Sequence, residues 1–358
     1  MAGSSIGNIF KVTTWGESHG KALGVVIDGV PAGVPLCEDD IQVLLNRRKP
    51  GQSKYTTPRN EGDICEILSG VFEGKTTGTP ISIVVFNKNQ KSSDYSEIAS
   101  YYRPGHADFT FDQKYGFRDY RGGGRSSGRE TIGRVAAGAV AEKVLKELGI
   151  SFLAYTKSIG PVSINTFDRD EIFENKLFMP DKEACVKASE YLDTLLSEGD
   201  SSGGIVECII EGVPAGLGDP VFEKLDANLA KAVFSIGAVK GFEIGDGFEA
   251  AIHRGTENND SFINENGEIK KATNHSGGIL GGISDGSPIV FRAAIKPTPS
   301  VSASQNTVNK AGDEISVSIK GRHDPVIVPR AVVVVEAMAA ITVLDAYLMN
   351  KSSKIENL

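Results

Sequence analysis

The sequence predicts a single α+β domain that contains two related halves. The first repeated segment is nearly identical in both, VIDGVPAG against IIEGVPAG. Three pairs of segments recur in the same order: 26–33 with 209–216, 70–81 with 278–289, and the helices opened by Arg134 and Arg330. Three recurrences in one order indicate an ancient duplication packed around one core, rather than a repeat solenoid. We expect the halves to span roughly residues 8–150 and 200–348 of one 358-residue domain.

Strands are expected where short runs rich in β-branched residues lie between glycine or proline turns. These runs are 24–30, 64–72, 81–86, 205–211 and 288–295. Helices are expected where apolar residues recur at helical spacing, in 38–48, 127–148, 181–198 and 221–235. Ser127 and Glu130 form a capping box at the start of the second helix, and small residues at 136–139 allow close helix packing. The polar stretch 257–274 predicts a surface hairpin, and 350–358 predicts a frayed tail.

Composition and charge exclude several classes of protein. The net charge of −8 opposes binding to nucleic acid, and four dispersed cysteines offer no disulfide framework. Neither a signal peptide nor an apolar run near the ~20 residues of a membrane span is evident, so we expect a cytoplasmic protein. No metal is expected, because no two histidines or cysteines have ligand spacing and H-E-x-x-H is absent. The 41 glycines indicate tight turns and a site built partly from main chain.

Histidines and arginines carry the chemical prediction. Four of the five histidines lie in glycine- or proline-rich turns, at His19, His106, His275 and His323. Histidine titrates near neutral pH and serves as a general acid or base, although a single turn histidine is more often a simple hydrogen-bonding residue. Five arginines stand against two acids in 118–134, and a second basic cluster spans 47–54. Guanidinium groups beside a glycine-rich helix start favour a phosphate or carboxylate ligand over a merely solvated surface.

Several other classes of protein match these residues only in part. Two segments, 16–20 and 124–128, match the G-x-S-x-G pattern of serine hydrolases, but neither lies between a strand and a helix as that elbow requires. Phosphate-loop and Rossmann fingerprints are absent, so kinases and nicotinamide dehydrogenases lose their main support. A non-catalytic binding module for phosphorylated metabolites stays open, since it would explain the arginines but not the histidines.

Eight motifs, taken in order from Asn8 to Leu348, closely resemble the chorismate synthase family. They are GESHG (16–20), RRKPG (47–51), RPGHAD (103–108), DYRGGGRSS (119–127), RET (129–131), AVKG (238–241), GGILGG (277–282) and GRHDP (321–325). The resemblance implies a β-α-β sandwich, with two sheets enclosing helices, and a homotetramer. It also implies a 1,4-anti elimination of phosphate from 5-enolpyruvylshikimate 3-phosphate to chorismate, in the shikimate pathway. Reduced flavin mononucleotide (FMN) would be required, although no net oxidation occurs.

The same resemblance implies roles for individual residues. His19 would protonate the departing phosphate, His106 would stabilise the reduced flavin, and Asp324 would receive the C6 proton by way of flavin N5. Flavin contacts would come from Arg125, Ser126, Ser127, Gly237, Ala238, Gly281, Lys296, Pro297, Thr298, Pro299, Ser300 and Arg322. Substrate contacts would come from Ser18, Arg48, Lys54, Arg129 and Arg134.

Two of these positions depart from the family pattern. Lys54 stands where arginine is frequent, which keeps the charge and loses the bidentate fork. Gly237 replaces a frequent asparagine and offers no side-chain contact. The two halves nearly exhaust the chain, so we expect no built-in flavin reductase and a supply of reduced FMN from an external reductase or reductant. A family-based assignment would alternatively place a nicotinamide donor, NADP, at Arg48 and Lys54.

Overall fold

Two antiparallel five-stranded sheets form the outer layers of the fold. The computed structural model describes residues 3–56, 62–87, 97–319 and 324–357. The strand order of the first sheet is β1 (Ser5–Ile6), β2 (Lys11–Gly16), β3 (Ala22–Asp28), β7 (Ile81–Phe86) and β4 (Cys65–Ser69). The order of the second is β11 (Val239–Ile244), β16 (Ile289–Ile295), β10 (Gly204–Glu211), β8 (Ser151–Ile159) and β9 (Val162–Ser163).

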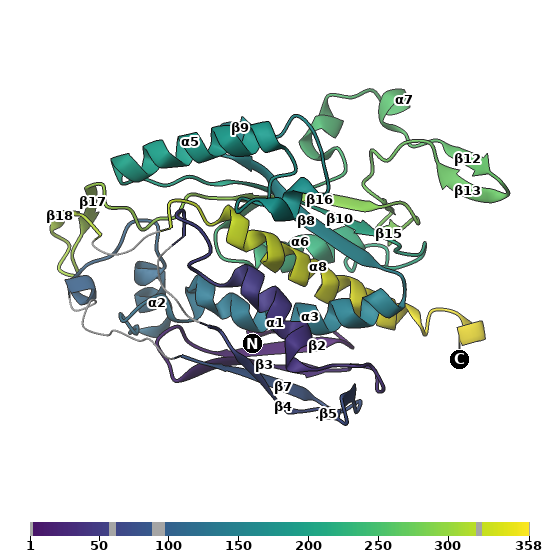
Figure 1. Cartoon of the computed structure of the whole chain (residues 1–358), viewed down its shortest axis with the longest axis horizontal. Helices are drawn as coiled ribbons and strands as arrows, with labels where there is room; N and C mark the ends of the chain where they lie inside the picture. The colour runs from purple at the N-terminus through teal and green to yellow at the C-terminus, as the bar shows by residue number, and fades with distance from the viewer. Residues whose placement is uncertain (1–2, 57–61, 88–96, 320–323, 358) are drawn as a thin grey trace.

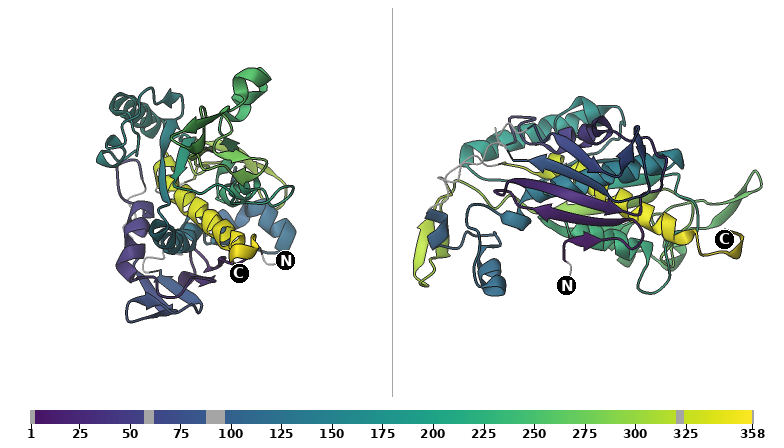
Figure 2. Two further views of the ribbon diagram at one scale, coloured as in Figure 1. Left: turned by 90° about the vertical axis from the view of Figure 1, so that its right-hand side faces the viewer. Right: turned by 90° about the horizontal axis from the view of Figure 1, so that it is seen from below.

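Four helices lie between the sheets: α1 (Glu38–Arg48), α3 (Thr131–Glu147), α6 (Leu225–Phe234) and α8 (Val328–Asn350). Figure 1 shows α1 and α3 above the first sheet and α8 beneath the second, and Figure 2 (right) views the first sheet from below with α8 behind it. The predicted α+β sandwich is confirmed. Its core is continuous across the layers, from Val25 and Ile83 in one sheet to Cys208 and Phe291 in the other.

The remaining elements decorate this sandwich. Short hairpins are β5–β6 (Val71–Phe72, Lys75–Thr76), β14–β15 (Ile279–Leu280, Ile283–Ser284), β12–β13 (Phe262–Glu265, Glu268–Lys271) and β17–β18 (Gln305–Val308, Glu314–Val317). Additional α-helices are α2 (Asp108–Tyr115), α4 (Glu171–Glu174), α5 (Lys182–Glu198) and α7 (Gly255–Asn258). Single 3₁₀ turns are η2 (Glu97–Ser100), η3 (Gly124–Ser126), η4 (Gly128–Glu130), η5 (Gly247–Ala251) and η6 (Ile355–Asn357).

The two halves share strand register. Ile27 of β3 lies opposite Ile81 of β7, and the corresponding Ile210 of β10 lies opposite Ile289 of β16. Each half therefore repeats the same pairing of its two central strands. A one-residue slip would turn every side chain to the other face, so this agreement supports the duplication.

The turn that follows β3 and β10 is held by the same hydrogen bonds in both halves. Thr76 Oγ1 donates to the Pro31 carbonyl (2.6 Å) and accepts from the Val34 amide (3.0 Å). In the second half, the Ser284 hydroxyl donates to the Pro214 carbonyl (2.6 Å) and accepts from the Leu217 amide (2.9 Å). Each hydroxyl thus satisfies one donor and one acceptor of a GVPAG turn, where the main chain has no strand partner.

Small residues let the two central helices approach closely, as the stripe at 136–139 predicts. A methyl group added at Gly138 of α3 would lie 2.3 Å from Cβ of Ala337 in α8. Gly133 likewise allows α3 to approach Thr14 and the carbonyl of Gly24 in the first sheet. Larger side chains at these two positions would push α3 away from both neighbours.

Helix α8 corrects one expectation from the sequence. It is long and apolar enough, by length and composition, to cross a membrane, with a mean hydropathy of 2.0 over its most apolar 18 residues. The prediction of no such run was wrong. Within the fold 72% of that stretch is buried, and the core helix of a soluble protein has the same composition. Packing between two sheets therefore explains why α8 is apolar on nearly every side.

Two predicted helix starts also differ from the structure. Helix α3 begins at Thr131, because residues 124–130 form two 3₁₀ turns, and Ser127 Oγ accepts from the Arg129 amide. Glu130 does not complete a capping box and instead accepts from Thr14 Oγ1 at 2.9 Å. Helix α6 begins only at Leu225, since Val221 takes a left-handed backbone conformation (φ 70°). The hairpin expected in 257–274 is present as β12–β13.

The two ends of the chain are tied together by one carboxylate. Asp345, near the end of α8, accepts the backbone amides of Asn8, Ile9 and Phe10 at 2.8 to 3.0 Å. These residues precede β2 and are separated from Asp345 by 335–337 positions. Hydrogen bonds to a charged carboxylate are among the stronger ones, so the last helix holds the first strands in place.

Candidate active site

The turn after β2 presents His19. The Gly20 amide bonds to the Glu17 carbonyl at 3.1 Å, and His19 Nδ1 lies 3.1 Å from the buried Ser18 hydroxyl. Gly122 (φ 152°) lies against the ring, because a Cβ there would sit 2.4 Å from Nδ1. The glycine-rich arginine segment therefore packs directly on the His19 turn, and the two line a small surface hollow.

Arg125 fastens this segment to the first sheet. Its guanidinium donates to the Gly16 carbonyl at 3.1 Å and to Thr14 Oγ1 at 2.6 Å. Ser126 Oγ donates to the Gly123 carbonyl at 2.7 Å, and Ser127 caps the following turn. The side chains of Arg125, Ser126 and Ser127 thus shape the loop whose flavin contacts were predicted.

Asn87 links the His19 turn to the arginines. Its amide nitrogen donates to the carbonyls of Glu17 (3.1 Å) and Gly20 (2.8 Å), and its oxygen accepts from Arg129 Nε at 2.6 Å. Arg129 Nη1 then binds Asp63 Oδ1 at 3.0 Å. A single amide side chain therefore fixes where Arg129 lies relative to the histidine turn.

Asp63 joins Arg129 to Arg48. Its second oxygen accepts from Arg48 Nη2 at 2.6 Å, and Arg48 is 1% exposed. Burial lowers the pKa of Arg48 to about 10, which leaves it protonated at neutral pH.

The carbonyl of Arg48, at the end of α1, accepts from Arg330 Nε at 3.2 Å. Arg330 Nη1 donates to Asp324 Oδ2 at 2.7 Å. A path therefore connects the His19 turn to Asp324 through hydrogen bonds and, at Arg48, through the residue itself from its guanidinium to its carbonyl.

His106 lies in a second part of the site. Its Nδ1 is 2.9 Å from the Pro104 carbonyl, which can only accept, so this nitrogen carries the proton. Its Nε2 lies 3.0 Å from the Ser300 hydroxyl and accepts from it in the neutral ring. Burial lowers the pKa of His106, and the positive charges of Arg103 and Lys296 lower it further. The imidazole is therefore neutral at physiological pH.

The segment that carries Lys296 brings the flavin candidates of the second half together. Lys296 Nζ donates to the Gly105 carbonyl at 2.9 Å, and the backbone amide of Lys296 donates to the Ala238 carbonyl, also at 2.9 Å. Pro299 packs against Gly105. Ala238 has a left-handed backbone (φ 73°), and Gly237 beside it has open space where a side chain would be. Lys296, Pro299, Ser300 and Ala238 thus meet around the His106 turn.

A strand-like contact joins this second part to Asp324. Ser201 Oγ donates to the Thr298 carbonyl at 2.7 Å, and the next residue, Ser202, donates its amide to the Pro325 carbonyl at 2.8 Å. Pro325 directly follows Asp324. The segment 296–300, which includes Pro297, therefore lies near the proposed base as well as near His106.

Three predicted residues lie apart from this cluster or are engaged elsewhere. Lys54 is exposed and forms an ion pair with Asp193 of α5 at 2.8 Å. Arg134 bonds to Glu130 and to the hydroxyl and carbonyl of Ser235. Gly281 lies in the β14–β15 hairpin, beside the start of α6, because the Gly282 carbonyl accepts a hydrogen bond from the Leu225 amide. Gly237 follows the end of α6, so these two flavin candidates lie at opposite ends of that helix. Arg322 lies outside the described residues.

The structure also adds residues that the sequence analysis missed. Asp63, Asn87 and Arg330 complete the hydrogen-bonded chain, yet Asp63 and Asn87 belong to no recognisable motif. Arg330 stands out in the sequence only as the repeat of Arg134. Their shared property, a polar residue bonded across more than one segment, becomes visible only in three dimensions.

Comparison with known proteins decides the family. A family model described as chorismate synthase matches residues 10–348. The chain belongs to the chorismate synthase family. A chorismate synthase from Agathobacter rectalis is 73% identical over 100% of this chain and 98% of its own, and one from Methanosarcina mazei is 56% identical over 97% of both. A solved structure titled "Crystal Structure of Chorismate Synthase" superposes with a TM-score of 0.78 at 33% identity, covering 98% of this chain and 96% of the other.

Membership in the chorismate synthase family defines the reaction class. The chain is an enzyme, a carbon–oxygen lyase that converts 5-enolpyruvylshikimate 3-phosphate to chorismate in the shikimate pathway of aromatic amino acid biosynthesis. Chorismate synthases use reduced flavin in this elimination without net oxidation of the substrate. The serine hydrolase and the non-catalytic binding module are thereby excluded as the chain's main function.

Proposed function

We propose that this elimination takes place at the hydrogen-bonded cluster that joins the His19 turn to Asp324. The observation that carries the proposal is the path through Asn87, Arg129, Asp63, Arg48 and Arg330. The path connects the turn that carries the candidate acid, His19, with the candidate base, Asp324, through three arginines. A phosphate ester that must lose both a phosphate and a proton needs this combination.

The charges of the cluster suit the substrate. Three guanidinium groups, those of Arg48, Arg129 and Arg330, face two carboxylates, so the cluster carries a net positive charge. A molecule with one phosphate and two carboxylates would be attracted to it and held in two-pronged fashion. Ser18 and Arg129 are the proposed contacts, and the buried Arg48 would act through its ion pair with Asp63, which also holds Arg129. Lys54 and Arg134 stay predictions, because their charged groups bond to Asp193 and to Glu130 and Ser235, outside this path.

His19 and Asp324 are the proposed acid and base. The His19 ring has Ser18 on one side and Gly122 on the other, which restricts its orientation beside the arginine segment. It would give a proton to the phosphate as the C–O bond breaks. Arg330 orients Asp324 through a 2.7 Å ion pair, and the carboxylate would take up the proton that leaves C6.

The second part of the site fits an anionic flavin. Thr298 Oγ1 is buried and has no hydrogen-bond partner among the described residues, as expected of a group that awaits a ligand. His106, Ser300 and Lys296 are bonded to one another or to the His106 turn in the same part of the fold, and open space lies beside Gly237. Reduced FMN would supply electron density that weakens the departing C–O bond. These residues would hold its ring and phosphate and exclude water.

Replacing His19 tests the proposed acid. We expect His19→Ala to fold and to release phosphate at least ~10²-fold more slowly than the unmodified enzyme with photoreduced FMN under nitrogen, as is typical of losing a general acid. Glu17→Gln, an exposed change on the same turn, is the matched control and should keep full activity. Near-normal turnover in His19→Ala at saturating FMN would refute its role.

Assembly and electron supply complete the proposal. We infer a homo-oligomer, in line with the cytoplasmic homotetramer that the family resemblance implies, because one chain does not bring Gly281 to the other flavin candidates and a contact from Gly281 would come from a neighbouring copy. Two related halves fill the fold, so reduced FMN would come from an external reductase. Enzyme, substrate, oxidised FMN and NADPH, kept dark under nitrogen without reductase, should form no chorismate. Sustained turnover there would instead show that NADP binds and that the chain reduces its own flavin.

A further inference from the structure

A separate group of histidines lies at the base of the β12–β13 arm, defined here as residues 247–274. Asp246 follows β11, His253 follows η5, and His275 follows the hairpin. Figure 1 shows β12 and β13 standing away from the two-sheet body. The group lies beyond the opposite end of β11 from Ala238, so it is distinct from the cluster around His106.

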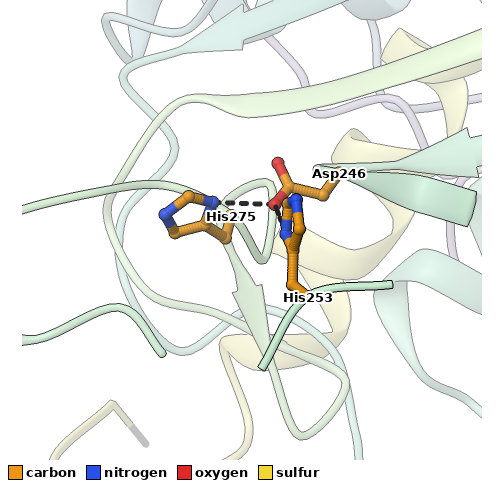
Figure 3. Close-up of side chains that lie close together, drawn as sticks. All are labelled: Asp246, His253 and His275. Carbon is orange, nitrogen blue, oxygen red and sulfur yellow. Dashed lines mark hydrogen bonds and ion pairs between the residues drawn. The ribbon is translucent and has the colours of Figure 1, made fainter. Parts of the chain in front are cut away.

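Three potential ligand atoms converge at this point. His275 Nδ1 lies 2.7 Å from Asp246 Oδ2, and His253 Nδ1 lies 3.4 Å from the same oxygen (Figure 3). All three atoms lie within 4.8 Å of one another. The side chains are 24–34% exposed, so an ion could enter from solvent. Hydrogen bonding explains the position of His275 but not that of His253, whose ring points at the carboxylate from too far for a good bond.

The protein holds two of these ligands in place before any ion binds. The Asp246 amide donates to the His275 carbonyl at 2.8 Å, and Asn258 Nδ2 donates to Asp246 Oδ2 at 3.1 Å. Asp260 accepts the amides of His275 (2.8 Å) and Ser276 (3.0 Å). Such outer bonds orient metal ligands and raise affinity in known metal sites.

We propose that Asp246, His253 and His275 bind one divalent transition-metal ion, with zinc as the preferred occupant and water in the fourth position. Two imidazoles and a carboxylate are typical zinc ligands with bonds of about 2.0–2.2 Å, which places tetrahedral ligand atoms about 3.3 Å apart. The Asp246–His253 distance already has this value, and the Asp246–His275 pair must open slightly. On binding, His275 moves its proton from Nδ1 to Nε2, so that Nδ1 is free to coordinate.

Neighbouring charges allow a cation here. Arg292 donates to the Gly245 carbonyl but is paired with Glu243 at 3.0 Å and with Glu207 at 3.7 Å. Lys271 is paired with Asp260 at 3.1 Å and with Asp285 at 2.8 Å, and Arg254 next to His253 is exposed to solvent. Spacing along the chain does not indicate this site, because His253 and His275 belong to different segments. An ion bound to all three residues would join the two ends of the arm and restrain its movement relative to the sandwich.

Cobalt binding tests the site directly. The full-length protein is stripped with chelator, exchanged into chelator-free buffer and titrated with Co²⁺, whose visible absorption reports tetrahedral coordination. We expect one Co²⁺ per chain, displaced by one Zn²⁺. His253→Ala, which alters an exposed side chain, and Asp246→Asn should each bind Co²⁺ at least about tenfold more weakly.

Two controls separate this site from adventitious binding. Glu249→Gln changes an acid in the neighbouring η5 turn, and Cys37→Ser removes the exposed thiol; both should bind Co²⁺ as the unmodified chain does. Equal binding in His253→Ala and the unmodified chain, or loss of binding in Cys37→Ser alone, would overturn the proposal. So would the absence of a visible Co²⁺ spectrum.

Proteolysis tests the clamping effect independently of catalysis. Arg254 and Lys270 are exposed in the arm and are sites for trypsin. Zn²⁺ should slow cleavage at both in the unmodified chain and should have no effect in His253→Ala. Cleavage that is equally fast with and without Zn²⁺ in the unmodified chain would contradict a restraint by metal. Neither readout requires the elimination reaction, so failure here leaves the proposed active site intact.

Discussion

Arg134 and Arg330 occupy equivalent positions in the two halves, and each reaches across to the other half. Arg134 of α3 donates to the Ser235 carbonyl at the end of α6, and Arg330 of α8 donates to the Arg48 carbonyl at the end of α1, both at 3.2 Å. Each arginine thus satisfies a carbonyl that its partner helix leaves open and places positive charge at the negative end of that helix.

The two arginines differ in their carboxylate partners. Arg134 binds Glu130, which accepts from Thr14 in the first sheet, whereas Arg330 binds Asp324 at the proposed site. The duplicated contact was therefore kept as a helix cap in both halves, while one copy also orients a reactive group. Equivalent substitutions in the two halves can therefore distinguish what each contact contributes to stability from what it contributes to turnover.

The largest contrast is expected between the two carboxylates. Asp324→Asn should bind substrate and lose at least ~10²-fold in turnover, because asparagine keeps the shape and cannot accept the proton. Glu130→Gln should stay within about tenfold of the unmodified rate. Anaerobic phosphate release with photoreduced FMN measures both. Full activity in Asp324→Asn would remove the proposed base, and equal losses would erase the distinction between the halves.

The arginines themselves should share a stability loss and differ in activity. Arg330→Met and Arg134→Met should each lower the free energy of unfolding by about 1–3 kcal/mol, as expected for charged hydrogen bonds, measured by urea denaturation. Only Arg330→Met should also reduce kcat, by roughly tenfold, because Asp324 loses its orientation. A higher KM with unchanged kcat in Arg134→Met would instead place Arg134 at the substrate, as the family resemblance implies.

Two buried acids on the same helix pair should respond differently to pH. Glu336 of α8 accepts from Arg47 (2.6 Å) and the Ala154 amide (3.0 Å), whereas Oε1 of Glu142 in α3 is buried without a hydrogen-bond partner among the described residues. Burial, followed by the charge of Glu336, raises the pKa of Glu142 to about 8. The neutral acid is therefore the form that the folded protein prefers.

The sign of the effect follows from this raised pKa. The stability that the neutral Glu142 side chain contributes is fully present below the ordinary glutamate pKa and is lost as pH rises through about 8. Between pH 6 and pH 9 we expect the free energy of unfolding of the unmodified chain to fall by about 1–3 kcal/mol, and that of Glu142→Gln to fall by less. Urea denaturation at both pH values measures the difference. Identical pH profiles for the two proteins would show that Glu142 is ionised in the fold.

The smallest effects should come from the two turn hydroxyls. Thr76→Val and Ser284→Ala each leave a carbonyl and an amide of a GVPAG turn unsatisfied, and each should cost about 1 kcal/mol in unfolding free energy. Because the bonds are the same in both halves, the two losses should agree within about 0.5 kcal/mol. A loss confined to one half would show that the turns share geometry without sharing energetic importance.

Local patterns predicted much of the fold. Helix 38–48 has the predicted bounds, since three acids open it and two arginines close it. The matching strand register of the two halves agrees with the duplication that the repeated GVPAG turns predict. Val221 shows the limit of periodicity, because its left-handed backbone delays α6 by several residues. The link of Asn87 to Arg129 and the approach of His253 to His275 depend on segments that meet only after folding. Patterns of residue spacing along the chain therefore do not predict these two contacts.

The clamp formed by Asp345 sets an order of events during synthesis. The amides of residues 8–10 leave the ribosome at the start of translation, and their carboxylate partner follows 335–337 residues later. At about 5–20 residues per second, the first sheet waits tens of seconds before α8 can cover its helices and fasten its edge. Throughout that interval the nascent chain exposes an incomplete apolar layer. Early folding of this enzyme is therefore expected to depend on chaperones that bind such surfaces until the C-terminal helix is released.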